Sequence, residues 1–222
     1  MASADAPSME PSGREPTILL LLWLAALVAS GIGPTDRLTW FMEVLPVIIA
    51  VPLLIATRRR FALTPLLLRL IFLHGLILIL GGHYTYAEVP LGFWFQDLFD
   101  LSRNHYDRLG HFAQGFVPAI LAREILLRVT PLRPGKMVFY LAASAALSFS
   151  AFFEMIEWWS ALVMGADADA FLATQGDIWD TQWDMFLALI GALVAQLLLA
   201  RAHDRQLAAM ASRGAVQPGR RG

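Results

Sequence analysis

Six apolar stretches, separated by charged residues, proline and glycine, constrain the fold of this chain more than any other feature. Most of them approach the roughly 20 residues that an α-helix needs to cross about 30 Å of hydrocarbon. The sequence therefore predicts an all-α, polytopic membrane helix bundle of about six transmembrane helices in residues 17–205. The predicted spans are Thr17–Gly33, Leu38–Ala56, Leu66–Gly82, Leu109–Val129, Met137–Met164 and Asp184–His203.

The first and fourth stretches have features that allow other interpretations. A cleaved signal peptide ending near Ser30 is the alternative for the first, but three acidic residues and only Arg14 precede the stretch. Signal peptides need a positively charged n-region, so an uncleaved helix is favoured. Polar residues, including Arg123 and Glu124, interrupt the fourth stretch. It can still span if these side chains face the interior of the bundle, away from lipid.

The composition also favours a membrane protein. Of the 222 residues, 57% are hydrophobic and 16% are charged, whereas soluble domains carry roughly 25% charged residues. A formal net charge of −1 argues against nucleic acid as a partner. The chain has no cysteine, which excludes disulfides and thiolate metal sites. Any metal ion would therefore be held by carboxylate, imidazole or water.

The distribution of basic residues predicts the orientation. Cytoplasmic loops of membrane proteins carry an excess of lysine and arginine. If the N-terminus is inside, the inner side receives most of the basic residues, and the outer side receives only Arg37, Arg103 and Arg108. We therefore expect both termini to be cytoplasmic. Residues 1–16 and 206–222 are polar and are expected to form disordered tails.

The segment between the third and fourth spans is rich in aromatic residues, including Gly92-Phe93-Trp94-Phe95. Aromatic side chains at headgroup level usually anchor a protein at the membrane interface. An interfacial loop is the simpler interpretation, and a lipid-binding lip would use the same chemistry.

Ionisable residues gather toward the predicted outer side of the membrane. Asp107 and His111 are spaced i, i+4 at the start of the fourth span, so both project from one helix face. Such a pair can form an ion pair, a proton relay or two metal ligands. A structural pair that satisfies two buried polar groups is the simpler alternative for these two residues alone.

Glu154 and Glu157 lie one turn apart within the fifth span. Two carboxylates this close cannot easily both stay ionised in a low dielectric, so one takes up a proton or a cation neutralises the pair. Either outcome suits a catalytic acid or base, or a metal site. The alternative is that water, or Arg103 and Arg108 of the outer loops, neutralises them.

Three aspartates, Asp177, Asp180 and Asp184, lead into the last span. The first two are suited to capping the N-terminus of a helix. Capping does not explain Asp184, which already lies within the apolar span. The small residues Ala188, Gly191 and Ala195 follow Asp184 on the same helix face and would let another helix approach closely. We therefore expect Asp184 to face a neighbouring helix.

Four segments resemble the YjdF-like bacterial inner membrane proteins: His83–Gly92, Arg103–Gly115, Glu154–Trp158 and Gln175–Met185. The resemblance implies a multi-pass inner membrane protein of a family whose biochemical role is unassigned. The chain is also similar to VanZ-like membrane proteins in an Asp-x3-His pair, a downstream Glu and an Asp-led last helix. That similarity suggests an envelope or lipid-linked role, although Ala188 stands where the pattern commonly has Asn.

The leading functional hypothesis is a periplasm-facing site for hydrolysis or transfer on a lipid-linked or other small-molecule substrate, with membrane lipid as partner. A divalent metal ion is the expected cofactor, and Glu154 or Glu157 would act as acid or base. The candidate metal ligands are Asp107, His111, Asp177, Asp180 and Asp184. A proton- or cation-coupled transporter and a non-catalytic membrane scaffold are the alternatives.

Overall fold

The computed structural model describes residues 14–165 and 172–216, and within these residues it contains helices and no strand. This confirms the predicted all-α class. Local sequence sets the helix starts: the Asp36 side chain accepts a hydrogen bond from the Thr39 N–H, and Thr64 caps the next helix, whose first residue is Pro65. The helices are α1 (Glu15–Ser30), α2 (Arg37–Thr57), α3 (Pro65–Tyr84), η1 (Tyr86–Glu88), α4 (Pro90–Phe99), α5 (Tyr106–Val129), α6 (Lys136–Met164) and α8 (Asp180–Val216).

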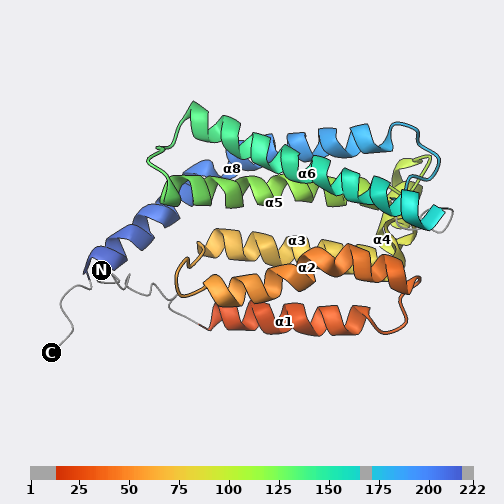
Figure 1. The fold of residues 1–222 in the computed structure, drawn as a ribbon, viewed down its shortest axis with the longest axis horizontal. Coiled ribbons are helices and arrows are strands. Elements are labelled where there is room, and N and C mark those ends of the chain that lie inside the picture. The colour runs from red at the N-terminus through yellow and green to blue at the C-terminus, as the bar shows by residue number, and fades with distance from the viewer. Residues whose placement is uncertain (1–13, 166–171, 217–222) are drawn as a thin grey trace.

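The long helices form two groups that lie side by side (Figure 1). α1 and α2 pack on α3, α6 and α8 pack on α5, and the two groups meet mainly where α3 contacts α5. η1, α4, the α1–α2 connection and the start of α8 lie at one end of the bundle, called the α4 end below. The α2–α3 and α5–α6 connections lie at the opposite end.

Four helices, α2, α3, α6 and α8, are long and apolar enough to cross a membrane. α1 is apolar but has 16 residues, which is short for a span. α5 has 24 residues, and its ionisable side chains at Asp107, His111, Arg123 and Glu124 are buried. The sequence predicted that this helix can span the membrane if these side chains face the interior of the bundle, and the structure places them there.

Two segments differ from the predictions. The sequence predicts a disordered tail from residue 206, but α8 continues to Val216. Residues 207–211 are strong helix formers, and the Gln206 side chain accepts a hydrogen bond from the Leu66 N–H at 2.9 Å. At the other terminus, α1 already includes Glu15 and Pro16. The rest of the predicted tails, residues 1–13 and 217–222, lies outside the described residues.

The predicted interfacial loop around Phe93 contains the ten-residue helix α4. Pro90 occupies its first turn, where the missing N–H of proline costs nothing. Trp94, Leu98 and Phe99 are 57%, 57% and 61% exposed, and their i, i+4, i+5 spacing puts them near one helix face. The aromatic residues of this segment therefore form an exposed apolar surface at the α4 end.

Candidate metal site

The close approach of α5 and α8 positions the site. A Cβ atom added to Gly115 of α5 would collide with the backbone carbonyl of Ala188 on α8, and one added to Gly191 would collide with the Phe112 carbonyl. The helices thus touch backbone to backbone, as the predicted stripe of small residues requires. His111 lies one turn before Gly115 and Asp184 one turn before Ala188, so this packing brings the two side chains together.

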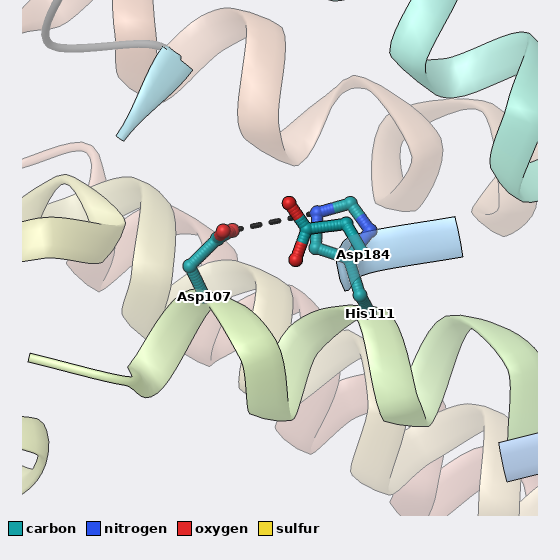
Figure 2. Close-up of side chains that lie close together, drawn as sticks. All are labelled: Asp107, His111 and Asp184. Atoms are coloured by element: carbon teal, nitrogen blue, oxygen red, sulfur yellow. Dashed lines mark ion pairs between the residues drawn. The ribbon is translucent and has the colours of Figure 1, made fainter. Parts of the chain in front are cut away.

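Asp107, His111 and Asp184 form the centre of the site (Figure 2). Asp107 and His111 project from α5 toward Asp184 of α8, and all three are buried, with 6%, 4% and 2% exposure. One ligand atom from each residue lies within 4.8 Å of the others. Two ligands on opposite sides of a divalent transition metal ion are separated by about 4.2 Å, so small side-chain rotations would bring the three onto one ion.

Glu154 of α6 adds a further carboxylate to this centre. His111 Nδ1 lies 3.5 Å from Glu154 Oε1, and His111 Nε2 lies 3.5 Å from Asp107 Oδ1. Glu154 Oε1, His111 Nδ1 and Asp184 Oδ1 are buried without a hydrogen-bond partner among the described residues. Buried polar atoms are rarely left unpaired because each costs about 1–3 kcal/mol. These three atoms belong to His111 and to two residues close to it, so a further polar or charged group bound there would give them a partner.

Glu157, the second glutamate of α6, is half-buried and lines a cavity of about 440 Å³ together with Asp107 and His111. Glu43 of α2 and His74 of α3 line the same cavity. Neither of them was predicted to belong to the site. Glu43 is 4% exposed, and His74 Nε2 has no hydrogen-bond partner in the part of the chain that the structure describes. The signal in the sequence was their position within apolar spans, where ionisable side chains usually mark functional sites.

Asp177 and Asp180, the other two predicted metal ligands, lie in a separate ion-pair network at the α4 end. Arg103 Nη2 is 2.7 Å from Asp180 Oδ1, and Arg108 Nη2 is 2.9 Å from Asp177 Oδ2. Asp177 also accepts a hydrogen bond from the Trp179 N–H, in a turn before α8 begins at Asp180. Arg103 and Arg108 thus neutralise these aspartates, whereas Glu154 contacts His111.

The same network fixes the segment before α8 to the start of α5. Arg103 donates to the Thr174 carbonyl, and Gln175 and Asn104 exchange hydrogen bonds. Partial burial lowers the pKa of nearby His105, and Arg108 lowers that pKa further. A neutral His105 at pH 7 adds no positive charge beside the two arginines.

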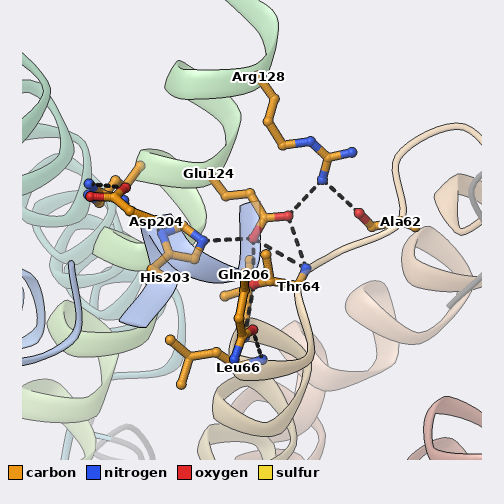
Figure 3. Close-up of polar contacts among 10 residues, drawn as sticks. Ala62, Thr64, Leu66, Glu124, Arg128, His203, Asp204 and Gln206 are labelled. Carbon is orange, nitrogen blue, oxygen red and sulfur yellow. Dashed lines mark hydrogen bonds and ion pairs between the residues drawn. The ribbon is translucent and has the colours of Figure 1, made fainter. Parts of the chain in front are cut away.

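A second polar network lies toward the opposite end of the bundle (Figure 3). Glu124 of α5 accepts hydrogen bonds from Thr64 N and Oγ1, and it pairs with Arg128 at 2.7 Å and His203 Nε2 at 2.9 Å. Arg123 contacts His203 Nδ1 at 2.9 Å and Asp204 at 2.7 Å. A guanidinium only donates, so Nδ1 must accept and His203 is a neutral ring that donates from Nε2. The place of His203 in this network was not predicted from the sequence.

The two networks differ in one respect that matters for function. Every carboxylate oxygen of Glu124 and both ring nitrogens of His203 have partners within the protein. The Asp107–His111–Asp184 centre instead has unpaired buried atoms. The Glu124 network is therefore a satisfied structural joint between α3, α5 and α8.

Comparison with known proteins places the chain in a family. The family described as "Predicted membrane protein (DUF2238)" matches residues 15–205. The chain belongs to this family. Inner membrane protein YjdF of Escherichia coli (strain K12) is 61% identical over 181 residues, which cover 82% of this chain and 87% of that protein. No solved structure matches the chain.

These matches confirm the predicted resemblance to YjdF-like proteins and the predicted location. The relative is an inner membrane protein, and the described residues of this chain include four helices long and apolar enough to cross a membrane. The chain is thus a multi-pass inner membrane protein. The four segments that carried the resemblance include Asp107, His111, Glu154, Glu157 and Asp184, so they contain the whole centre of the site.

Proposed function

We propose that this protein binds a divalent cation between Asp107, His111 and Asp184 and uses it for hydrolysis or transfer on a lipid-linked substrate. The observation that carries the proposal is that one ligand atom from each of these buried residues lies within 4.8 Å of the others. In addition, His111 Nδ1 and Asp184 Oδ1 are buried without a hydrogen-bond partner among the described residues. Carboxylate oxygen and imidazole nitrogen suit Mn²⁺, Fe²⁺ or Zn²⁺. A cation would neutralise carboxylates that are costly to bury alone.

The proposal includes a six-span topology with both termini cytoplasmic. The connections at the end opposite α4 carry Arg58, Arg59, Arg60 and Arg133, and the first residue of α6 is Lys136. The basic C-terminal part of α8 lies at that end as well. This distribution supports a cytoplasmic location for that end by the positive-inside rule. The metal site, near the α4 end, would then face the periplasm.

The side chains around the centre suit hydrolysis or transfer. A divalent cation would polarise a phosphoryl or carbonyl oxygen and lower the pKa of a bound water. Glu154 lies against His111, and Glu157 lines the adjoining cavity. Glu157 is therefore the better placed of the two to exchange a proton with a substrate in the cavity, while Glu154 would complete the coordination or orient His111.

A lipid-linked substrate fits the position of the site. In the proposed topology the centre lies between the membrane-crossing helices α5 and α8, and a largely apolar cavity leads to it. Transport is supported less well. The polar groups at the opposite end, around Glu124, are fully paired with one another, whereas a relay needs groups that can exchange partners.

The test combines metal content with turnover of the full chain in nanodiscs. Asp184→Asn should lower the bound divalent metal by at least about tenfold, because it removes one charged ligand. Glu157→Gln should keep the metal but abolish metal-dependent release of headgroups from a phospholipid mixture, measured by mass spectrometry. A wild-type protein that binds metal but releases no headgroup would overturn the reaction and leave the cation site. A wild-type protein without metal would overturn both.

A further inference from the structure

The cavity beside the metal site continues as a long apolar groove. Its polar end contains Glu43, His74, Asp107, His111 and Glu157. The rest of its wall comes mainly from apolar side chains of α2, α3, α5 and α6 and of the α2–α3 connection, with Gln114 and Thr57 as polar exceptions. α2 packs on α3, α6 packs on α5, and all four helices line the groove.

The groove is longer than one leaflet of hydrocarbon. On α5 its wall runs from His111 to Val129, which at 1.5 Å per residue is about 27 Å. On α2 the wall runs from Glu43 to Thr57, or about 21 Å by the same measure. One leaflet contributes about 15 Å to the hydrocarbon core. The groove can therefore hold a full-length lipid chain along the helices.

The groove is also open on its side. Leu53 of α2, Ile125 and Val129 of α5, and Phe149 of α6 line it and are 58%, 42%, 67% and 46% exposed. In the proposed six-span topology these helices lie in the membrane, so their exposed apolar side chains would face hydrocarbon. A chain could thus enter sideways from the bilayer, with its polar head directed to the ionisable end.

We propose that the groove binds the hydrocarbon chain of a membrane phospholipid and holds the lipid phosphate at the Asp107–His111–Asp184 centre. This inference rests on the proposed function and names its substrate class. The groove matches such a lipid in its polarity, because its ionisable groups lie at one end and its walls beyond are apolar except for Gln114 and Thr57. A phosphate oxygen is a hard donor that a divalent cation in this centre would coordinate.

Two neighbouring residues of α2 provide a matched pair of variants. Ala50 lines the groove, whereas Ile49 does not and is 56% exposed on another side of the helix. Ala50→Trp fills the groove, and Ile49→Trp adds a similar bulk elsewhere. The full chain is purified in mild detergent, and the phospholipid and metal retained per protein are measured by mass spectrometry. Ala50→Trp should retain about tenfold less phospholipid than Ile49→Trp and wild type, with unchanged metal.

A second measurement needs no variant. Hexadecyl phosphate should displace the retained phospholipid from wild-type protein, and hexyl phosphate should not at the same concentration, because its chain cannot fill the groove. Equal retention by Ala50→Trp and Ile49→Trp, or equal competition by the two alkyl phosphates, would overturn the inference. If wild-type protein holds phospholipid in the groove but contains no divalent metal, the proposed function fails and the lipid-binding groove remains.

Discussion

The substitution Gly115→Ala tests whether the α5–α8 contact builds the metal site. Alanine is the better helix former by about 1 kcal/mol, so in an open helix this change would be stabilising. At Gly115, however, the new Cβ would collide with the carbonyl of Ala188, and neither backbone can yield without moving its helix. We expect the collision to outweigh the propensity and to lower the free energy of unfolding by about 1–3 kcal/mol.

The same separation should weaken metal binding. Asp184 lies one turn before Ala188 on α8, and it reaches Asp107 and His111 across this contact. A displacement of α8 by about 1 Å would move one ligand out of the 2.0–2.2 Å range of metal–oxygen bonds. We expect the affinity for a divalent cation to fall at least about tenfold, as for loss of supporting contacts around other metal sites.

The assay is unfolding in increasing sodium dodecyl sulfate, followed by circular dichroism, with metal content measured on the same samples. Gly135→Ala is the matched control, because the nearest atom to its added Cβ is the Arg133 carbonyl oxygen at 3.9 Å. That control should stay within about 0.5 kcal/mol of wild type. If Gly115→Ala were as stable as the control and kept its metal, the argument from backbone contact would be refuted.

Three further substitutions test other parts of the structure. Glu124→Ala should destabilise the protein by about 3–5 kcal/mol, because it removes the carboxylate that half-buried Arg128 and buried His203 contact; an unfolding curve like that of wild type would contradict this. Asp36→Ala should cost about 1 kcal/mol at pH 7 through loss of the α2 cap. Hydrogen bonds from the Thr39 backbone lower the pKa of Asp36 below its usual 3.8, so the ionised cap stabilises above that value. The difference between wild type and Asp36→Ala should shrink as the pH falls through the lowered pKa, and a difference independent of pH would argue against an ionised cap. Arg103→Gln should speed hydrogen exchange in residues 172–180 and leave the metal content unchanged, since Arg103 contacts Thr174, Asp177 and Asp180 and none of the three central residues; loss of metal would instead assign those aspartates to the metal site.

Hydropathy predicted most of the helices because each long helix carries apolar side chains along nearly its whole length. It could not predict α4, whose ten residues are too few for a periodic signal in an aromatic segment. It also ended α8 at the last strongly apolar residues, although helix formers continue through residue 211. The six-span topology stays a proposal, because α1 is short and α5 carries buried charges.

For the site, helical spacing paired Asp107 with His111, and the small-residue stripe directed Asp184 to a neighbouring helix. Spacing cannot show which helices are neighbours, so it could not separate Asp184 from Asp177 and Asp180, which pair with arginines. It also could not place Glu43 and His74 at the cavity. The Glu124 network was out of reach for the same reason, since Thr64 and His203 lie 60 and 79 residues from Glu124 in the chain.

The central claim is that Asp107, His111 and Asp184 hold a divalent cation. Metal analysis of the purified full chain, beside Asp184→Asn and the distant control Gly135→Ala, tests it most directly. We predict about one divalent ion per wild-type and Gly135→Ala chain, and at least about tenfold less in Asp184→Asn. No bound metal in wild type, or the same content in Asp184→Asn, would contradict the claim.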